Sequence, residues 1–528
     1  MKQNQWHNLI FIITSLLVIF GSFYPNIVEW HRTPPNTTYS FTFGHNGDFN
    51  QVLYFIKSGT EGHILYKIPY SEKDVPPFLL QTVYFVFGFI LSPITKSPVV
   101  ILYILRIISI TVFFACLLRL IRTAFRTFSL QLTAFILVIT STSIWTTSTD
   151  NGQTIFHVPI PWNDTFDAYR KFIILPHHFL AIAAIILLTL MMAKMPWTKK
   201  HAIIASVLTI LIASLHPYHL MLVVLMTVFY GSTLWILNER LRKSVLLMTT
   251  SIVGTATVTY GFYAIIMRRA YPWIQQNLLQ ELLHFHQTFP FSTYWLSLGP
   301  VAFLSLLFLF PTIKRQVHPL FFLLFLWAVI PFLVFQFADI GVMQEFKTHQ
   351  YIPLALLATC GLEYLIDRYR PCLILIPLII VGAIIYVLPP YLNACLSANT
   401  EHLESYFNFY IPDYLTRSFT YLDKNTPNRS VVLAGATLSM LIPVFTHDYV
   451  FMGQGNSVAD YNTRVMTAIN FYNQNMSPSD MKTFLLTHRI SYIIFSIDAP
   501  AFNGNFPIYP FLKEVYRDGP SSIIQVVP

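Results

Sequence analysis

One aspartate stands alone in the polar stretch that follows the first apolar segment of the chain. Residues 39–50 read YSFTFGHNGDFN, and Asp48 is the carboxylate among them. A carboxylate within hydrogen-bond reach of a hydroxyl group can accept its proton and so make the oxygen a better nucleophile. Aspartate is also a favoured cap for a helix, here one that starts at Phe49. Asp48 is therefore a candidate catalytic base, and a capping role is compatible with it.

Two basic pairs stand beside apolar segments. Arg268 and Arg269 directly follow one such segment, and Arg170 and Lys171 directly precede another. The planar guanidinium group of arginine can hold a phosphate through two parallel hydrogen bonds. Long cationic side chains can equally reach out to ordinary lipid headgroups. The choice between these roles depends on the side of the membrane on which the neighbouring spans place these pairs.

The composition is that of an integral membrane protein. The 528 residues are 54% hydrophobic and 11% charged, whereas a soluble domain has about 25% charged residues. The formal net charge of +9 would suit a nucleic-acid partner, but the basic residues form short clusters between apolar runs, which argues against that class. Four cysteines make no close pair, so neither a disulfide framework nor a zinc cluster built on them is indicated.

Apolar runs predict a mainly α-helical, polytopic protein with about 11 transmembrane helices, because about 20 residues cross the hydrocarbon core. A further run, 77–95, decides the orientation of all that follow. Five short loops rich in arginine and lysine fall together on the cytoplasmic side only if 77–95 does not cross. We therefore predict an interfacial or re-entrant helix there, with the N-terminus cytoplasmic and the C-terminus outside. The predicted spans are 8–24, 98–118, 128–146, 172–193, 201–215, 217–237, 244–266, 294–311, 318–338, 350–366 and 371–390.

The apolar runs stop near residue 391. This predicts a transmembrane domain, 1–391, with a long outer loop at 25–97, and an exported soluble domain, 392–528. The exported part alternates strand-like runs such as 430–435 with helical runs such as 463–473. Alternation of this kind predicts a small α/β domain with a mostly parallel sheet. The domain lacks the glycine patterns of nucleotide sites.

The first outer loop resembles that of the GT-C class of membrane glycosyltransferases, which use a lipid-phosphate-linked sugar as donor. In that class an aspartate soon after the first span begins the loop, a short helix ending in glycine follows, and a juxtamembrane helix introduced by two prolines precedes the second span. The matching residues are Asp48, Gly59, Gly62, Pro76 and Pro77. The segments Pro176-His177-His178 and His216-Pro217-Tyr218, with the exported tail, resemble uncharacterised bacterial members of the class.

The resemblance implies a GT-C-type glycosyltransferase that moves a sugar, with inversion, from a polyprenyl-phosphate-linked donor to a glycan, lipid or protein acceptor. The reaction would take place on the outer face of a bacterial-type plasma membrane. Asp48 would accept the proton of the acceptor hydroxyl, and the departing lipid phosphate would need cations or a metal rather than an acid. The residues expected to bind the donor phosphate are Arg170, Arg268, Arg269, Lys347 and His349.

Lys347 and His349 belong to the segment QEFKTHQ at 344–350. This segment resembles a charged turn that faces the donor phosphate in related transferases. A local surface pair between Glu345 and Lys347 is the alternative interpretation of this turn. On the outer face, Arg170, Arg268 and Arg269 stand where cations beside span ends are uncommon, which favours a specific role for them.

A divalent cation, Mg²⁺ or Mn²⁺, is a further expectation. The first loop lacks the second acid of a D-x-D motif, but Asp164 and Asp167 of the second outer loop could join Asp48 as oxygen ligands. Solvated loop acids are the alternative for both. His216 and His219 are expected to belong to a structural break rather than a metal site, because two histidines alone lack a third ligand.

Two other classes of function compete with the transferase. A membrane transporter or a flippase of lipid-linked sugars would carry ionisable residues near mid-membrane, whereas these spans have almost no acidic residue in their centres. A non-catalytic envelope scaffold with a binding tail would use the membrane part as an anchor, for which eleven spans are excessive.

Overall fold

A computed structural model of the chain is mainly helical and divides into two compact units. The helical unit comprises Met1–Pro25, Ile104–Tyr263 and Glu281–Ala398, and the mixed unit comprises Asn26–Tyr103, Ala264–Gln280 and Asn399–Pro528. The predicted boundary at residue 391 stays a prediction. The structure describes residues 2–42, 46–65, 67–73, 81–150, 153–157, 159, 170–173, 175–269, 290–310, 318–337, 349–397, 409–453, 458, 460–496 and 509–527.

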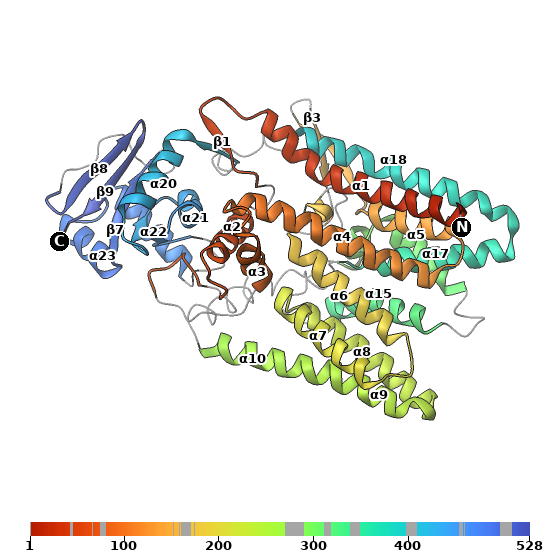
Figure 1. The fold of residues 1–528 in the computed structure, drawn as a ribbon. Helices are drawn as coiled ribbons and strands as arrows, with labels where there is room; N and C mark the ends of the chain where they lie inside the picture. The colour runs from red at the N-terminus through yellow and green to blue at the C-terminus, as the bar shows by residue number, and fades with distance from the viewer. Residues whose placement is uncertain are drawn as a thin grey trace. The chain divides into compact units, whose positions relative to one another are not determined.

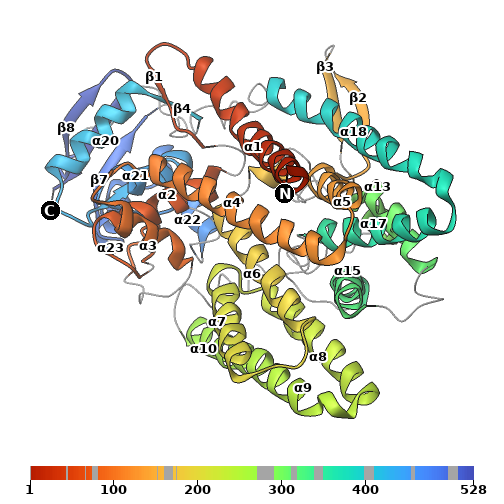
Figure 2. The same ribbon diagram turned by 45° about the vertical axis from the view of Figure 1, so that its right-hand side comes forward.

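Long apolar helices form the helical unit, and neighbouring helices pack side by side. Helix α17 packs against α5 and α15, and α5 also packs against α18 (Figure 1). Helices α7, α8 and α9 lie together in a second group (Figure 2). The bounds are α1 Lys2–His31, α4 Pro98–Ala124, α5 Phe128–Thr140, α6 Pro176–Met192, α7 Lys199–Leu215, α8 His219–Leu237, α9 Arg242–Thr249, α10 Thr255–Arg269, α12 Phe291–Ser297, α13 Pro300–Ser305, α15 Pro319–Phe337, α17 Tyr351–Arg368 and α18 Leu375–Ser397.

Several of these helices turn large apolar side chains outward. Leu378 and Ile385 of α18 are 61% and 63% exposed, and Leu17 of α1 is 64% exposed. Surfaces of this kind are stable against lipid and not against water. The protein is therefore a multi-pass membrane protein.

The predicted number of spans is not confirmed. Each predicted span coincides with helical structure, but within the described residues five helices are long and apolar enough to cross, and a sixth counts if a bent pair is one span. The bent pair, α12 and α13, replaces the straight span predicted at 294–311 and turns by 95°. Gly299 adopts a φ of +74° at the bend, and a Cβ there would lie 1.7 Å from the carbonyl oxygen of Thr142. A continuous helix is therefore excluded at this position.

The mixed unit contains helices from the loop after α1 and an α/β fold built by the tail. Its five-stranded sheet has the order β6-β5-β7-β9-β8. The strand pairs β5–β6 and β5–β7 are parallel, and β7–β9 and β8–β9 are antiparallel, so the predicted mostly parallel sheet is instead mixed. The bounds are α2 Asn46–Thr60, α3 Thr82–Leu91, α20 Asp413–Asn425, β5 Val431–Leu433, α21 Ala436–Phe445, β6 Tyr449–Val450, α22 Tyr461–Tyr472, α23 Pro478–Thr487, β7 Ile490–Phe495, β8 Leu512–Asp518 and β9 Ser521–Val526.

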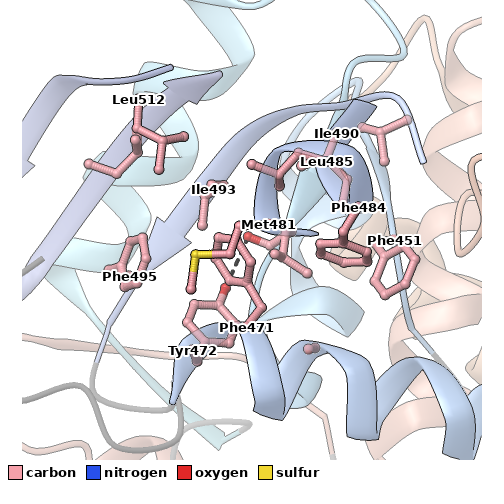
Figure 3. Close-up of a cluster of buried hydrophobic side chains, with 14 of the residues drawn as sticks. Phe451, Phe471, Tyr472, Met481, Phe484, Leu485, Ile490, Ile493, Phe495 and Leu512 are labelled. Carbon is pink, nitrogen blue, oxygen red and sulfur yellow. Dashed lines mark hydrogen bonds between the residues drawn. The ribbon is translucent and has the colours of Figure 1, made fainter. Parts of the chain in front are cut away.

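Side chains of α22 and α23 pack against one face of this sheet. Phe471 and Phe484 lie with Ile493 and Phe495 of β7 in one buried cluster (Figure 3). The hydroxyl of Tyr472 donates to the carbonyl oxygen of Ile494 at 3.0 Å, so the polar end of this buried ring has a partner. Helix α20 packs against β8 and β9. The tail thus buries a core of its own.

The loop after α1 is tied to the tail within the mixed unit. Strand β1, Thr37–Tyr39, pairs antiparallel with β4, Tyr410–Pro412. The amide of Val450 at the end of β6 donates to the carbonyl oxygen of Pro69 at 2.9 Å. These backbone hydrogen bonds hold the loop against the tail, which the sequence of the loop alone does not predict.

Helix α3 is the helix that the structure describes within 77–95, and the expectation that this run does not cross the membrane stays a prediction. Its ten residues rise about 15 Å, half of a hydrocarbon core about 30 Å thick. Helices α2 and α3 touch backbone to backbone, because a Cβ on Gly59 would lie 2.2 Å from the carbonyl oxygen of Phe85 and one on Gly88 would lie 2.2 Å from that of Ile56. The rings of Phe55 and Phe85 stack beside this contact.

Substituting Gly59 by alanine should therefore push α2 and α3 apart. We expect a loss of about 1–3 kcal/mol of local stability, the usual effect of overpacking. Hydrogen exchange of the α2 amides measures it. Gly62→Ala is the comparison variant. At Gly62 φ is +88° and an added Cβ would meet no described atom within 4 Å, so alanine there strains the backbone without a clash. Equal protection of α2 in Gly59→Ala and in the native chain would contradict the close contact.

Asp448, between α21 and β6, is 1% exposed and accepts hydrogen bonds from the Thr426 hydroxyl at 2.9 Å on each carboxylate oxygen. Burial raises the pKa of Asp448 from 3.8 to about 6, although the bond from Thr426 opposes the shift. The folded chain therefore binds this proton more tightly than the unfolded chain, and stability falls as the pH rises from about 4 to 6.

Asp448→Asn should stabilise the mixed unit at pH 7.5, by up to about 3 kcal/mol for a shift of this size. At pH 4 the native carboxyl is already protonated, so the difference between variant and native chain should nearly vanish. Urea unfolding of the full chain in detergent, followed by circular dichroism at both pH values, measures this. An equal difference at pH 4 and pH 7.5 would show that ionisation of Asp448 is not its cause.

Candidate functional site

Asp48 lies in the first turn of α2 and is half-buried. The helix follows the polar stretch predicted around it, and the positive end of the helix dipole stabilises a carboxylate there. Helix α2 begins at Asn46 and not at the predicted Phe49, so Asp48 is inside the first turn and is not the cap that the sequence suggested.

The other predicted site residues are distributed over both units. Arg268 and Arg269 are the last two residues of α10, and Arg170 begins the short 3-10 helix η2, Arg170–Phe172. Asp164, Asp167 and Lys347 lie outside the described residues. His349 is described, directly before α17, and is 1% exposed. The joint action of Asp48 and these residues at one site stays a prediction.

Lys171 has a structural role that the sequence did not indicate. Its ammonium group is buried and donates to the carbonyl oxygens of Val138 at 3.0 Å and Ser141 at 2.7 Å. These carbonyls belong to the last turn of α5 and the residue after it, where a helix lacks its own donors. Lys171 therefore caps α5 rather than reaching toward headgroups.

A cavity of about 710 Å³ lies in the mixed unit. It is lined by α2, by residues 96–99 at the start of α4, and by β4 and α21 of the tail. Asn50 contributes an amide nitrogen that is buried and has no hydrogen-bond partner among the described residues. The polar lining residues are Ser40, Asn50, Lys57, Thr60, Glu61, Lys96 and Ser97.

The two lysines of the cavity differ in their hydrogen bonding and in their exposure. Lys57 donates to the carbonyl oxygens of Thr446 and Pro443 in α21 and its C-terminal end, and burial lowers the pKa of Lys57. Lys96 donates to the carbonyl oxygen of Thr60 at 3.0 Å and is more exposed. A cavity of this size with a few convergent polar groups is typical of a small-molecule site. Asp48 is not among the described residues that line it.

Five histidines gather in the helical unit, at the ends of four helices. Pro176 starts α6, which places His177 and His178 in its first turn. Pro217 prevents α7 from continuing, so His216 ends α7 and His219 begins α8. The fifth is His349, before α17. The sequence suggested the three segments that carry these histidines but not that they meet.

The imidazole rings of this histidine cluster are in mutual contact. Ring centroids are 4.2 Å apart for His177 and His178, 5.0 Å for His178 and His216, and 4.1 Å for His216 and His219. His349 closes the group at 5.3 Å from His219 and 6.5 Å from His178. One ligand nitrogen from each of His177, His178 and His216 lies within 4.8 Å of the others, close enough to hold a divalent cation.

Comparison with protein-family models and with curated protein sequences found no match. Solved structures do match. The AglB oligosaccharyltransferase of Archaeoglobus fulgidus, in complex with an inhibitory peptide and a dolichol-phosphate, aligns with 93% of this chain and 69% of its own at 11% identity and a TM-score of 0.53. The same enzyme with zinc and sulfate covers 90% and 67% at a TM-score of 0.52 and 11% identity. ArnT from Cupriavidus metallidurans, in the apo state, covers 99% and 98% at 12% identity and a TM-score of 0.52.

Both enzymes are GT-C glycosyltransferases. The chain therefore has a GT-C-like fold along nearly its whole length, which confirms the resemblance predicted from the first outer loop.

Proposed function

We propose that the chain is an integral-membrane glycosyltransferase that moves a sugar from a polyprenyl-phosphate-linked donor to an acceptor on the outer face of a bacterial-type plasma membrane. The observation that carries the proposal is the match of nearly the whole chain to two GT-C transferases, one of them bound to dolichol-phosphate. The position of Asp48 in the first turn of the first helix after α1 agrees with it.

The proposed step is a single displacement at the anomeric carbon. Asp48 accepts the proton of the acceptor hydroxyl, the acceptor oxygen forms the new bond to the anomeric carbon, and the bond from that carbon to the phosphate oxygen breaks. Polyprenyl phosphate leaves with the electron pair, and the configuration at the anomeric carbon inverts. Arg268, Arg269, Lys347, His349 and Arg170 are proposed to neutralise the charge that develops on the phosphate.

The expected Mg²⁺ or Mn²⁺ site stays a prediction. A carboxylate site would use Asp48 with Asp164 and Asp167, of which Asp48 alone is described. Within the described part of the chain, the side chains that gather with ligand spacing are histidines, which suit transition metals better than Mg²⁺. No step of the proposed reaction is therefore assigned to a metal.

We propose that the tail helps to bind the acceptor in the cavity of the mixed unit. The lining of this cavity includes α2, whose first turn contains Asp48, and elements of the tail. The buried amide of Asn50 lacks a partner among the described residues, and a hydroxyl of a bound glycan could accept its hydrogen bond.

Reconstitution in vesicles separates this function from its rivals. The purified chain is given polyprenyl-phosphate donors carrying different sugars, with a mixture of envelope glycans and lipids as acceptors, and free polyprenyl phosphate is measured by mass spectrometry. A transferase releases polyprenyl phosphate in step with glycosylated acceptor. A flippase moves intact donor between leaflets, and a scaffold does neither. Movement of intact donor without release would refute the transferase.

A further inference from the structure

We infer that the histidine cluster of the helical unit is a zinc site, formed by His177, His178 and His216 together with His219 or His349. The inference does not depend on the proposed transfer reaction, although a His349 that binds zinc would not also bind the donor phosphate. It rests on three observations: the spacing of the ligand atoms, two deeply buried rings whose nitrogens lack partners among the described residues, and the kind of ligand that gathers there.

The spacing is near that of a metal site. Four nitrogens around a tetrahedral zinc lie about 3.3 Å apart, because each Zn–N bond is about 2.0 Å long. The candidate atoms of His177, His178 and His216 already lie within 4.8 Å of one another. Rotation of the rings about their side-chain bonds covers the remaining difference. The rings come from the ends of α6 and α7, so the backbone is fixed at each.

Two further rings could supply a fourth ligand. His219 and His349 are each 1% exposed, and neither ring nitrogen of either residue has a hydrogen-bond partner among the described residues. A buried polar group without a partner costs about 1–3 kcal/mol. Their rings lie 5.3 Å apart and border His216 and His178. A cation bound by the first three histidines would give at least one of these nitrogens a partner.

The chemistry of the cluster selects the ion. Neutral imidazole is a ligand for zinc and other transition metals, whereas Mg²⁺ and Mn²⁺ prefer oxygen. The group found among the described residues contains no carboxylate. An ion here would join the start of α6 and the end of α7 to the start of α8 or of α17, so we assign it a structural role in holding these helix ends together.

The test uses the full chain purified in detergent with an affinity tag that contains no histidine. The protein is stripped with a chelator, incubated with Zn²⁺ and freed of excess metal, and bound zinc is measured by mass spectrometry. We expect one Zn²⁺ per chain, a shell of nitrogen neighbours at about 2.0 Å in X-ray absorption, and a higher unfolding temperature with zinc.

His178→Ala and His216→Ala should bind zinc at least about 100-fold more weakly and lose the zinc-dependent rise in unfolding temperature. His318→Ala is the matched control, because His318 also stands at the start of a membrane helix, before Pro319, but is exposed and outside the cluster. If a variant does not fold, Co²⁺ bound to the native chain provides a second readout, since tetrahedral nitrogen ligands give it a characteristic visible spectrum. Zinc well below one per chain in the native protein, or zinc retained in both variants, would overturn the inference.

Discussion

Replacing Asp48 by asparagine is expected to slow sugar transfer by about 100- to 10,000-fold, the usual contribution of a general base. Asparagine keeps the shape of the side chain but cannot accept the proton of the acceptor hydroxyl. Asparagine loses only the favourable interaction of the carboxylate with the helix dipole, about 0.3–1 kcal/mol, so α2 should remain intact. A catalytic role and a purely structural role of Asp48 therefore predict different results: catalysis requires a large loss of rate, and a structural role alone requires almost none.

The matched control is Asp480→Asn. Asp480 also lies in the first turn of a helix, α23, where Ser477 caps the amide of Asp480. Its substitution removes a charge from an equivalent position in the tail and should leave the transfer rate within about twofold. Release of polyprenyl phosphate per enzyme measures both variants, and their unfolding temperatures show whether the fold is kept. If Asp48→Asn consumes the donor at the native rate, the transfer reaction stands but Asp48 is not its general base.

Local patterns in the sequence were enough to predict many of the elements. The glycines at 59 and 62 mark the end of α2 and Pro217 marks the end of α7, whereas α2 starts at Asn46, before the predicted Phe49. Strand β5 and helix α22 of the tail coincide with the predicted runs 430–435 and 463–473. These features depend on residues within one or two turns of each other, which is the range over which a single sequence is informative.

Features that depend on distant residues could not be predicted. Strand β8, LKEVYRD, carries charges on four of its seven residues, so its sequence does not read as a strand, yet charges suit an edge strand that must resist further pairing. Its antiparallel pairing with β9 makes the sheet mixed. Arg106 lies within α4, where its guanidinium donates to the carbonyl oxygens of Ser22 and Phe172. Neither acceptor has a recognisable sequence signal.

The candidate site shows the same limit. Each histidine of the cluster belongs to a motif that has an ordinary structural explanation, and His216 with His219 lacks a third ligand when the motif is considered alone. The third and later ligands come from helix ends at residues 177, 178 and 349. A pair of adjacent histidines after a proline, followed by two more around Pro217, was the available signal, and it indicates a metal only when the helix ends are known to meet.

Substituting Arg464 by methionine is expected to cost the mixed unit about 3–5 kcal/mol, because it leaves a buried charge unpaired. Arg464 and Glu72 are 2% and 8% exposed and stand 392 positions apart in the chain. The guanidinium donates to the Glu72 carboxylate, to Asp460 at 2.9 Å and to the carbonyl oxygen of Phe451 at 2.6 Å. Methionine fills a similar volume but satisfies none of these acceptors.

The matched control is Arg517→Met, which breaks the exposed pair of Arg517 and Glu514 and should cost less than about 1 kcal/mol. Hydrogen exchange of the β5 and β7 amides in the full chain measures the local free energy of unfolding for both variants. Comparable losses in Arg464→Met and Arg517→Met would contradict a special role for the buried pair.

The same pair predicts how stability depends on pH. Burial would raise the pKa of Glu72, but hydrogen bonds from Arg464 and His488 outweigh burial and lower that pKa below its usual 4.5. The contribution of Glu72 is therefore fully present above about pH 4.5 and is lost as the pH falls through its lower folded value. Glu72→Gln should be less stable than the native chain at pH 7, and the difference should shrink at pH 3. Ionisation of Asp448 changes stability with pH in the opposite direction, so the Glu72→Gln comparison is made in the Asp448→Asn background. A stability difference that does not shrink at pH 3 would exclude ionisation of Glu72 as its source.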